Sequence, residues 1–279
     1  KRMHIENIIF TLVLIVLITL FYVNFKRIID NIKLGRSVNR FDRPLNRWKN
    51  MIRVALGQSK MVRRPVAGLL HVIIYLGFVI INIEVIEIIV DGIFGTHRFL
   101  AGILNSGLYN FLIFSFEILA LLVLLACVVF LVRRNIIKIK RFFGQEMKKW
   151  PRTDANLILI FEILLMSAFL VMNACDSLLF GHNISVYNVG FSNPVSVYLE
   201  PLFKDMTISS LILFERFCWW FHIVGILLFL NYVLISKHLH IFFAFPSTYF
   251  ANLNPLGEFN NLDSVTNEVK LIYELKRDI

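Results

Sequence analysis

The chain carries too little charge for a soluble protein of its length. Only 17% of its 279 residues are Asp, Glu, Lys or Arg, whereas 57% are hydrophobic and the mean hydropathy is +0.70. Soluble domains hold about 25% charged residues, which keep their surfaces hydrated. The composition therefore argues against an ordinary soluble enzyme and favours an integral membrane protein.

Cysteine is also scarce, and its spacing excludes two common metal sites. The three cysteines form no CxxC pair, so the sequence encodes neither a zinc site nor an iron–sulfur cluster. Cys127, Cys175 and Cys218 each fall within a long apolar run, where we expect a small space-filling side chain and no disulfide. The chain shows no internal repeat and no low-complexity tract.

The sequence is rich in long apolar runs instead. A helix that crosses a hydrocarbon core of about 30 Å needs roughly 20 residues. Five runs approach or exceed this length: residues 8–23, 66–90, 108–132, 155–180 and 208–235. The first lacks the small-residue cleavage site of a signal peptide. The runs predict an all-α, polytopic bundle of five transmembrane helices over residues 1–245, followed by a cytoplasmic tail over residues 246–279.

Positive charge gathers in two of the connections between the runs. Lys and Arg are dense in residues 26–64 and 133–152, whereas the opposite connections hold few, chiefly Arg98 and Lys204. Cytoplasmic loops carry such an excess, so the N-terminus is expected outside and the C-terminus in the cytoplasm. The formal charge of +10 then needs no nucleic-acid partner. We expect a multi-pass protein of the bacterial inner membrane.

Histidines within or near the spans are candidate functional residues, because ionisable groups in a membrane are costly. The last span and its inner end are expected to form one helix, on which His222 and His240 are 18 residues or five turns apart, on one face and about 27 Å from each other. His238 would point to nearly the opposite face. Two histidines so placed can each ligate a haem iron. Alternatively, His222 hydrogen-bonds a neighbour and His240 is an interfacial polar residue.

His71 strengthens the haem interpretation. It lies near the cytoplasmic end of the second span, on the membrane side expected for His240. A haem with two histidine ligands takes one from each of two facing helices. We therefore expect His71 and His240 to face each other across a gap wide enough for a porphyrin. The alternative is a capping or packing histidine at a helix start.

The last span resembles a known family. Residues 222–230, continued by residues 236–241 and by Phe245-Pro246, are similar to the last span of the dihaem cytochrome b subunit of respiratory nitrate reductase. Related membrane subunits of heterodisulfide-reductase-type complexes share this span. The resemblance implies that His222 ligates an outer haem, whereas His240 and His71 ligate an inner one.

The sequence departs from that family at one position. The family has a second histidine ten residues after the first in the second span, and Ile81 stands there, beside Asn82. Either the outer haem is absent or another histidine supplies its ligand. His97, just beyond the second span, is the candidate, provided that Gly92 and Gly95 let the chain turn back.

The tail extends the resemblance. Residues 245–257 and 264–270 resemble the junction of membrane-anchored iron–sulfur oxidoreductases, in which a cytochrome module precedes a cytoplasmic domain with 4Fe–4S clusters. Residues 75–92 share that likeness. The resemblance implies a cytoplasmic 4Fe–4S partner, either a separate subunit or a domain outside this sequence.

Carboxylates in the second span leave two interpretations open. Glu84, Glu87 and Asp91 follow a 3-then-4 spacing that places them on one helix stripe. They could accept the protons that quinol oxidation releases. They could equally form ion pairs, with Arg216 for example, that hold the bundle together. No carboxylate is assigned a catalytic role.

Together these features predict a membrane electron-transfer subunit of a quinone-linked oxidoreductase. It would exchange electrons between menaquinol or another quinol and the iron–sulfur partner through one or two b-type haems. The alternatives are a transporter or channel and a haem-free anchor of a respiratory complex. The absence of sequence repeats and of paired Gly/Pro-broken spans disfavours a transporter.

Overall fold

A computed structural model describes residues 5–139, 142, 144–145, 149–255, 257 and 262–276. Within these residues the chain forms helices and no strand. Parts of the second basic connection and of the predicted tail fall outside the described residues.

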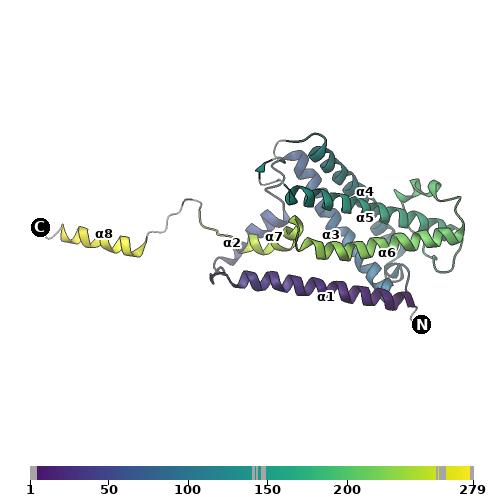
Figure 1. Cartoon of the computed structure of the whole chain (residues 1–279), viewed down its shortest axis with the longest axis horizontal. Helices are drawn as coiled ribbons and strands as arrows, with labels where there is room; N and C mark the ends of the chain where they lie inside the picture. Colours follow the sequence, from purple (N-terminus) through teal and green to yellow (C-terminus); the bar gives the residue numbers. More distant parts are fainter. Residues whose placement is uncertain are drawn as a thin grey trace.

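Five helices are long and apolar enough to cross a membrane. They are α1 (Ile5–Lys33), α3 (Pro65–Phe94), α4 (Ser106–Asn135), α5 (Trp150–Gly181) and α6 (Ile208–Val233). They lie side by side in one bundle, with α5 between α4 and α6, and α1 against α3 and α6 (Figure 1). The predicted all-α class with five spans is confirmed.

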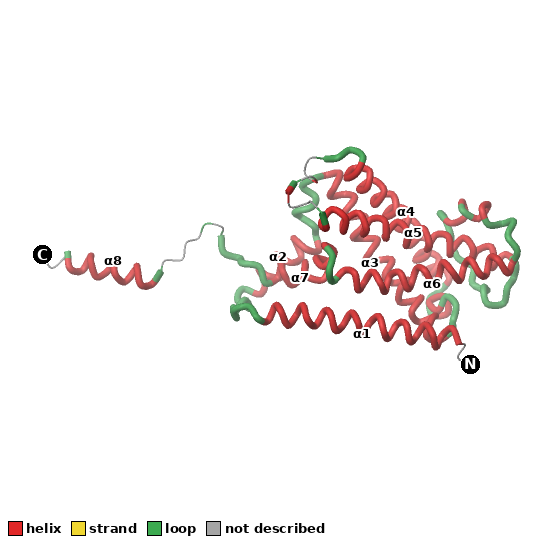
Figure 2. The backbone as a smooth tube through the Cα atoms, viewed as in Figure 1, coloured by secondary structure: helices red, strands yellow, loops and turns green. Residues whose placement is uncertain are grey.

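The shorter elements lie mostly at the two ends of the bundle. They are α2 (Pro44–Met51), a π-turn (Ile52–Leu56), α7 (His240–Tyr249), α8 (Asp263–Leu275) and four 3-10 turns (Phe99–Gly102, Ser196–Tyr198, Glu200–Leu202 and Lys237–Leu239). We call the end where α1 begins the amino-terminal end, and the opposite end, where α2 packs on α7, the tail end. Figure 2 shows α8 apart from the bundle.

Local sequence signals set the helix ends. Proline occupies the first turn of α3 and α5, where its missing N–H leaves no bond unmade. Asn105 and Thr207 cap α4 and α6 by accepting hydrogen bonds from the Leu108 and Ser210 amides at 2.8 and 3.2 Å. α3 ends at Gly95, whose φ of 63° suits glycine.

Small residues bring the helices close together. Gly225 of α6 faces Leu165 of α5 so closely that an added Cβ would lie 2.7 Å from a Leu165 methyl carbon. Gly92 of α3 faces the Phe10 ring of α1 in the same way. Such contacts favour helix association in membranes, where packing replaces the hydrophobic effect.

The expectation of a continuous last helix is wrong. α6 ends at Val233, and α7 begins only at His240 after a turn and a 3-10 turn. The Ser236 hydroxyl accepts a hydrogen bond from the His238 amide at 3.0 Å and so starts a new segment. His222 and His240 therefore lie on two helices. Pro246 lies inside α7 and does not end the long helix.

Arg47 of α2 ties down the chain that leaves α7. Its buried guanidinium donates to the Tyr249 and Ala251 carbonyls at 3.1 and 3.0 Å and pairs with Asp42 at 2.5 Å. Hydrogen bonds from Arg47 and Arg43 lower the pKa of the Asp42 carboxyl to about 2. The contact fixes where the tail departs, nine residues beyond His240.

Candidate functional site

The structure brings His71 and His240 together at the tail end. His71 lies in the second turn of α3, and His240 is the first residue of α7. Their ring centroids are 6.4 Å apart, with the ring planes inclined by 40°. His240 Nδ1 donates to the Lys237 carbonyl at 2.8 Å, which leaves Nε2 for another partner. His71 Nδ1 is buried without a hydrogen-bond partner.

The spacing of this pair fits two imidazoles on opposite sides of one metal ion. An imidazole nitrogen binds a first-row metal at about 2.0 Å, and that nitrogen lies about 1.1 Å from the ring centre. Two ligands on opposite sides of the metal then have centroids about 6.2 Å apart. The measured separation of 6.4 Å agrees with this value. Bis-histidine ligation of a haem iron places two imidazole rings at about this separation.

His238 joins the same group, contrary to expectation. Its ring centroid lies 5.6 Å from that of His240 and 5.7 Å from that of Phe229. The break after α6 turns His238 back toward the bundle. Burial lowers its pKa to about 4, and the nearby His240 and His71 rings act in the same direction. His238 is therefore neutral near pH 7.

His222 of α6 is fully buried, and one of its two ring nitrogens has a hydrogen-bond partner. Its Nδ1 donates to the Leu165 carbonyl at 2.9 Å, whereas Nε2 is buried without a hydrogen-bond partner. Metal-binding histidines are held in this way, with one ring nitrogen tied to a carbonyl and the other left for the metal. The ring contact described for His222 is with Phe169, at 5.8 Å.

Ile81 stands where the pattern of the resembled family has its second histidine. α3 and α6 run in opposite directions, with Ile81 13 residues before the end of α3 and His222 14 residues after the start of α6. Each therefore lies about 20 Å along its own helix from the helix end nearer the amino-terminal end of the bundle. The Ile81 side chain is buried in the core and cannot bind iron.

His97 folds back onto α5 at the amino-terminal end. Its Nε2 lies 3.4 Å from an Asp176 carboxylate oxygen, and its ring packs on Tyr187 at 4.9 Å. Gly95 makes the turn, whereas Gly92 stays within α3. Among the described ring contacts of His97, none is with His222. Its assignment as the second ligand of an outer haem stays a prediction.

Arg98 organises the buried polar groups of this end, which the sequence did not reveal, because a loop arginine normally faces water. It contacts the Asp176 carboxylate through two nitrogens at 2.9 and 2.7 Å and donates to Asn173 at 2.8 Å. Its guanidinium stacks 3.9 Å above the Phe191 ring. Burial opposes the charge of Arg98, but Asp176 holds its pKa well above the usual value.

The carboxylates near Arg98 divide into paired and unpaired groups. Glu215 accepts two bonds from Arg216, both at 2.6 Å, and one from the Tyr187 hydroxyl at 2.7 Å. The sequence left open whether Arg216 forms an ion pair with the carboxylates of α3. In the structure Arg216 pairs with Glu215. Glu84 is 2% exposed, and one of its carboxylate oxygens is buried without a partner.

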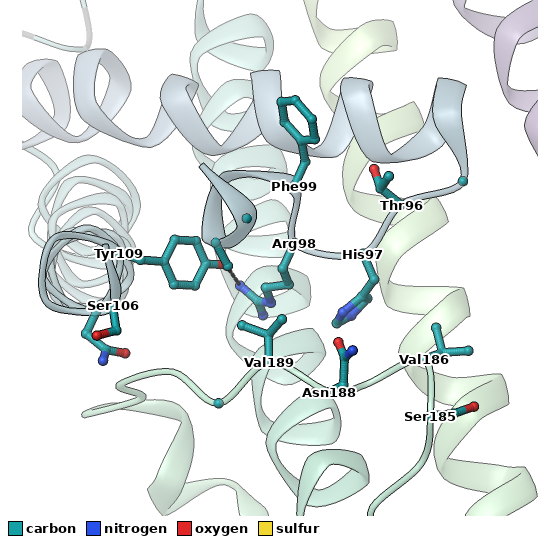
Figure 3. A pocket seen from close by; sticks show the side chains of 15 residues that line it. Thr96, His97, Arg98, Phe99, Ser106, Tyr109, Ser185, Val186, Asn188 and Val189 are labelled. Carbon is teal, nitrogen blue, oxygen red and sulfur yellow. Dashed lines mark hydrogen bonds between the residues drawn. The ribbon is translucent and has the colours of Figure 1, made fainter. Parts of the chain in front are cut away.

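A cavity of about 770 Å³ opens at the amino-terminal end. It lies between the loop after α3, the start of α4 and the loop over residues 185–190, and His97 and Arg98 extend from the first loop toward Asn188 and Val189 (Figure 3). A second space of about 30 Å³ lies deeper, among side chains that include Glu84 and Glu87. His97 and Arg98 line both spaces.

Two curated proteins are similar to most of this chain. It is 26% identical over 246 residues, or 87% of its length, to a protein named "Probable iron-sulfur-binding oxidoreductase FadF" from Bacillus subtilis. It is 21% identical over 227 residues, or 78% of its length, to a protein named "EtfAB:quinone oxidoreductase" from Syntrophomonas wolfei. The chain spans about a third of each relative, 32% and 30%. No family model and no solved structure matches it.

Proposed function

We propose that this chain is the membrane electron-transfer module of a quinone-linked oxidoreductase. In this role it passes electrons between a membrane quinol, such as menaquinol, and an iron–sulfur protein at the tail end. The pairing of His71 with His240 carries the proposal, because a ring separation of 6.4 Å suits one haem iron. The names of the two relatives, one iron–sulfur-binding and one a quinone oxidoreductase, support it.

The chain's own residues supply the binding and the orientation of a b-type haem. His71 and His240 would hold its iron, and the Lys237 carbonyl fixes the tautomer and direction of the His240 ring. A haem bound there would carry single electrons. His222 offers one ligand for a second haem, and His97 stays the candidate for the other.

The tail end is where we place the iron–sulfur partner. Arg47 holds the chain at Tyr249 and Ala251, so the tail leaves the bundle close to the His71–His240 pair. A partner docked on this end would have the shortest electron-transfer distance to that pair. By the positive-inside rule this end faces the cytoplasm of a bacterial cell.

The decisive test is a pyridine haemochrome spectrum of the purified protein. We expect a b-type band near one haem per chain, lost in both His71→Ala and His240→Ala. The exposed loop histidine His182 provides the matched control, since His182→Ala should keep the band. His238→Ala should also keep it, which separates the proposed ligand from its neighbour. A folded parent protein without haem would refute the proposal.

A further inference from the structure

The carboxylate stripe of α3 joins the bundle interior to its amino-terminal end. Glu84, Glu87 and Asp91 lie at intervals of three and four residues, so they climb one face of α3 by about 10 Å. Side chains spaced in this way lie about 5–6 Å apart at Cβ, a gap that one water molecule can bridge. Glu84 and Glu87 are buried, and Asp91 lies in the last turn.

Charge balance sets this stripe apart from its surroundings. The deeper space is lined by five carboxyl groups and two guanidinium groups. Arg98 pairs with Asp176, and Arg216 pairs with Glu215. The unbalanced negative charge therefore falls on the three members of the stripe. Burying unpaired ionised carboxylates is too costly, so protons must reside on the stripe.

The number of hydrogen bonds to a carboxyl group falls along the stripe from Asp91 to Glu84. Asp91 accepts from the Thr96 hydroxyl at 2.5 Å and from the Arg98 and Phe99 amides at 2.8 and 3.2 Å. Glu87 accepts from the Leu100 amide at 2.9 Å. The buried oxygen of Glu84 has no partner, so it suits a neutral acid at the deep end.

The surrounding space completes a path to water. Glu84 and Glu87 line the deeper space of about 30 Å³, which is large enough for a water molecule. His97 and Arg98 stand between this space and the cavity of about 770 Å³. Glu117 of α4 lies outside the path, because Ser196 and Asn173 occupy both of its oxygens.

We propose that Glu84, Glu87 and Asp91 form a proton pathway from the bundle interior to the cavity at the amino-terminal end. Each proton taken up at Glu84 displaces one along the stripe, and one leaves Asp91 for water, so the charge of the stripe is unchanged after each transfer. The source of the proton rests on the proposed function. Oxidation of one quinol releases two protons, while its two electrons leave toward the iron–sulfur partner.

Infrared spectroscopy tests the pathway without any turnover. In the parent-minus-Glu84→Gln difference spectrum of the whole protein at neutral pH, we expect the carbonyl stretch of a protonated carboxylic acid, shifted by exchange into D2O. A difference spectrum that contains only the bands of an ionised carboxylate would overturn the proposal. This measurement is independent of haem and quinol.

Turnover supplies the second test, with a water-soluble menaquinol analogue as the donor and the intact oxidoreductase in vesicles. Glu84→Gln and Glu87→Gln should slow quinol oxidation and proton release at least about tenfold, because acid–base groups contribute 10²–10⁴-fold. Haem content should not change, and Glu84→Asp should recover part of the rate. Glu162→Gln removes a carboxyl of α5 outside the stripe and should stay within about twofold of the parent.

The outcomes separate the two proposals. If the parent oxidises the quinol analogue and Glu84→Gln matches its rate, the pathway is refuted while the proposed function stands. If the parent does not oxidise quinol, the proposed function fails. The infrared spectrum then still decides whether Glu84 holds a proton.

Discussion

Truncating Arg98 should destabilise the amino-terminal end of the bundle by about 3–5 kcal/mol, because it strands a buried charge. Asp176 is 2% exposed and receives two bonds from the guanidinium. Arg98→Ala leaves that carboxylate with His97 alone and removes the bond to Asn173 as well. The loss should therefore exceed the value of about 1 kcal/mol that is usual for an exposed ion pair.

A double-mutant cycle isolates this effect. Arg98→Met with Asp176→Leu removes both charges together, so neither is left buried without its ion-pair partner. Exchanging a buried ion pair in this way is often neutral or stabilising. We expect the double variant to be at least about 2 kcal/mol more stable than the summed losses of Arg98→Met and Asp176→Leu predict, a coupling seen only between residues in contact.

Two measurements test this. Unfolding of the detergent-solubilised protein gives the stability, and hydrogen exchange at residues 95–102 reports how tightly the loop is held. Arg98→Ala should raise exchange in this loop, since the side chain anchors it to α5. Additive losses in the double variant would refute the reasoning, as would a loss below about 1 kcal/mol for Arg98→Ala.

Three further predictions concern the two ends of the bundle. Arg47→Ala should expose residues 248–252 to proteolysis, because each hydrogen bond to a charged group contributes about 1.5–3 kcal/mol, and unchanged cleavage would contradict the clamp. Asp42 has a folded pKa of about 2 against an ordinary 3.8, so its stabilisation is complete above the ordinary value and is lost as pH falls through the folded one. The Asp42→Asn variant should therefore lack this contribution to the loss of stability in acid. Identical profiles of stability against pH for the variant and the parent would argue against it. His97→Ala should lower the haem count only if His97 ligates iron; an unchanged count and redox titration would remove it from the ligand set.

The five spans could be predicted because membrane helices must satisfy their backbone internally and face hydrocarbon. Both demands are met by long runs of apolar residues, which can be recognised in the sequence. The boundaries differ where a helix continues beyond the apolar run. α1 extends past residue 23 to Lys33, because helix geometry does not stop where hydrocarbon ends. Hydropathy alone cannot report that extension.

The site was less accessible to sequence reasoning, for a geometric reason. The register of His222 and His240 assumed one helix, but Ser236 starts a new segment before α7. His71 nevertheless meets His240, since the two lie at one end of the bundle whatever the path between them. The prediction for His238 was wrong because it depended on that path. The buried pairing of Arg98 with Asp176 was not predicted, because it arises from tertiary contacts with α5.

The missing outer histidine leads to a last prediction. His222 has a buried nitrogen without a partner, and Ile81 stands on α3 in place of the second histidine of the resembled family. Ile81→His should therefore give His222 a second imidazole and raise the haem count by one per chain, provided that the parent holds only the haem of His71 and His240. An unchanged count would follow if the parent already used His97, which the His97→Ala variant detects separately. If neither substitution changes the count, then His222 is a buried packing histidine that Leu165 holds in place, and the electron path runs through the tail-end pair alone.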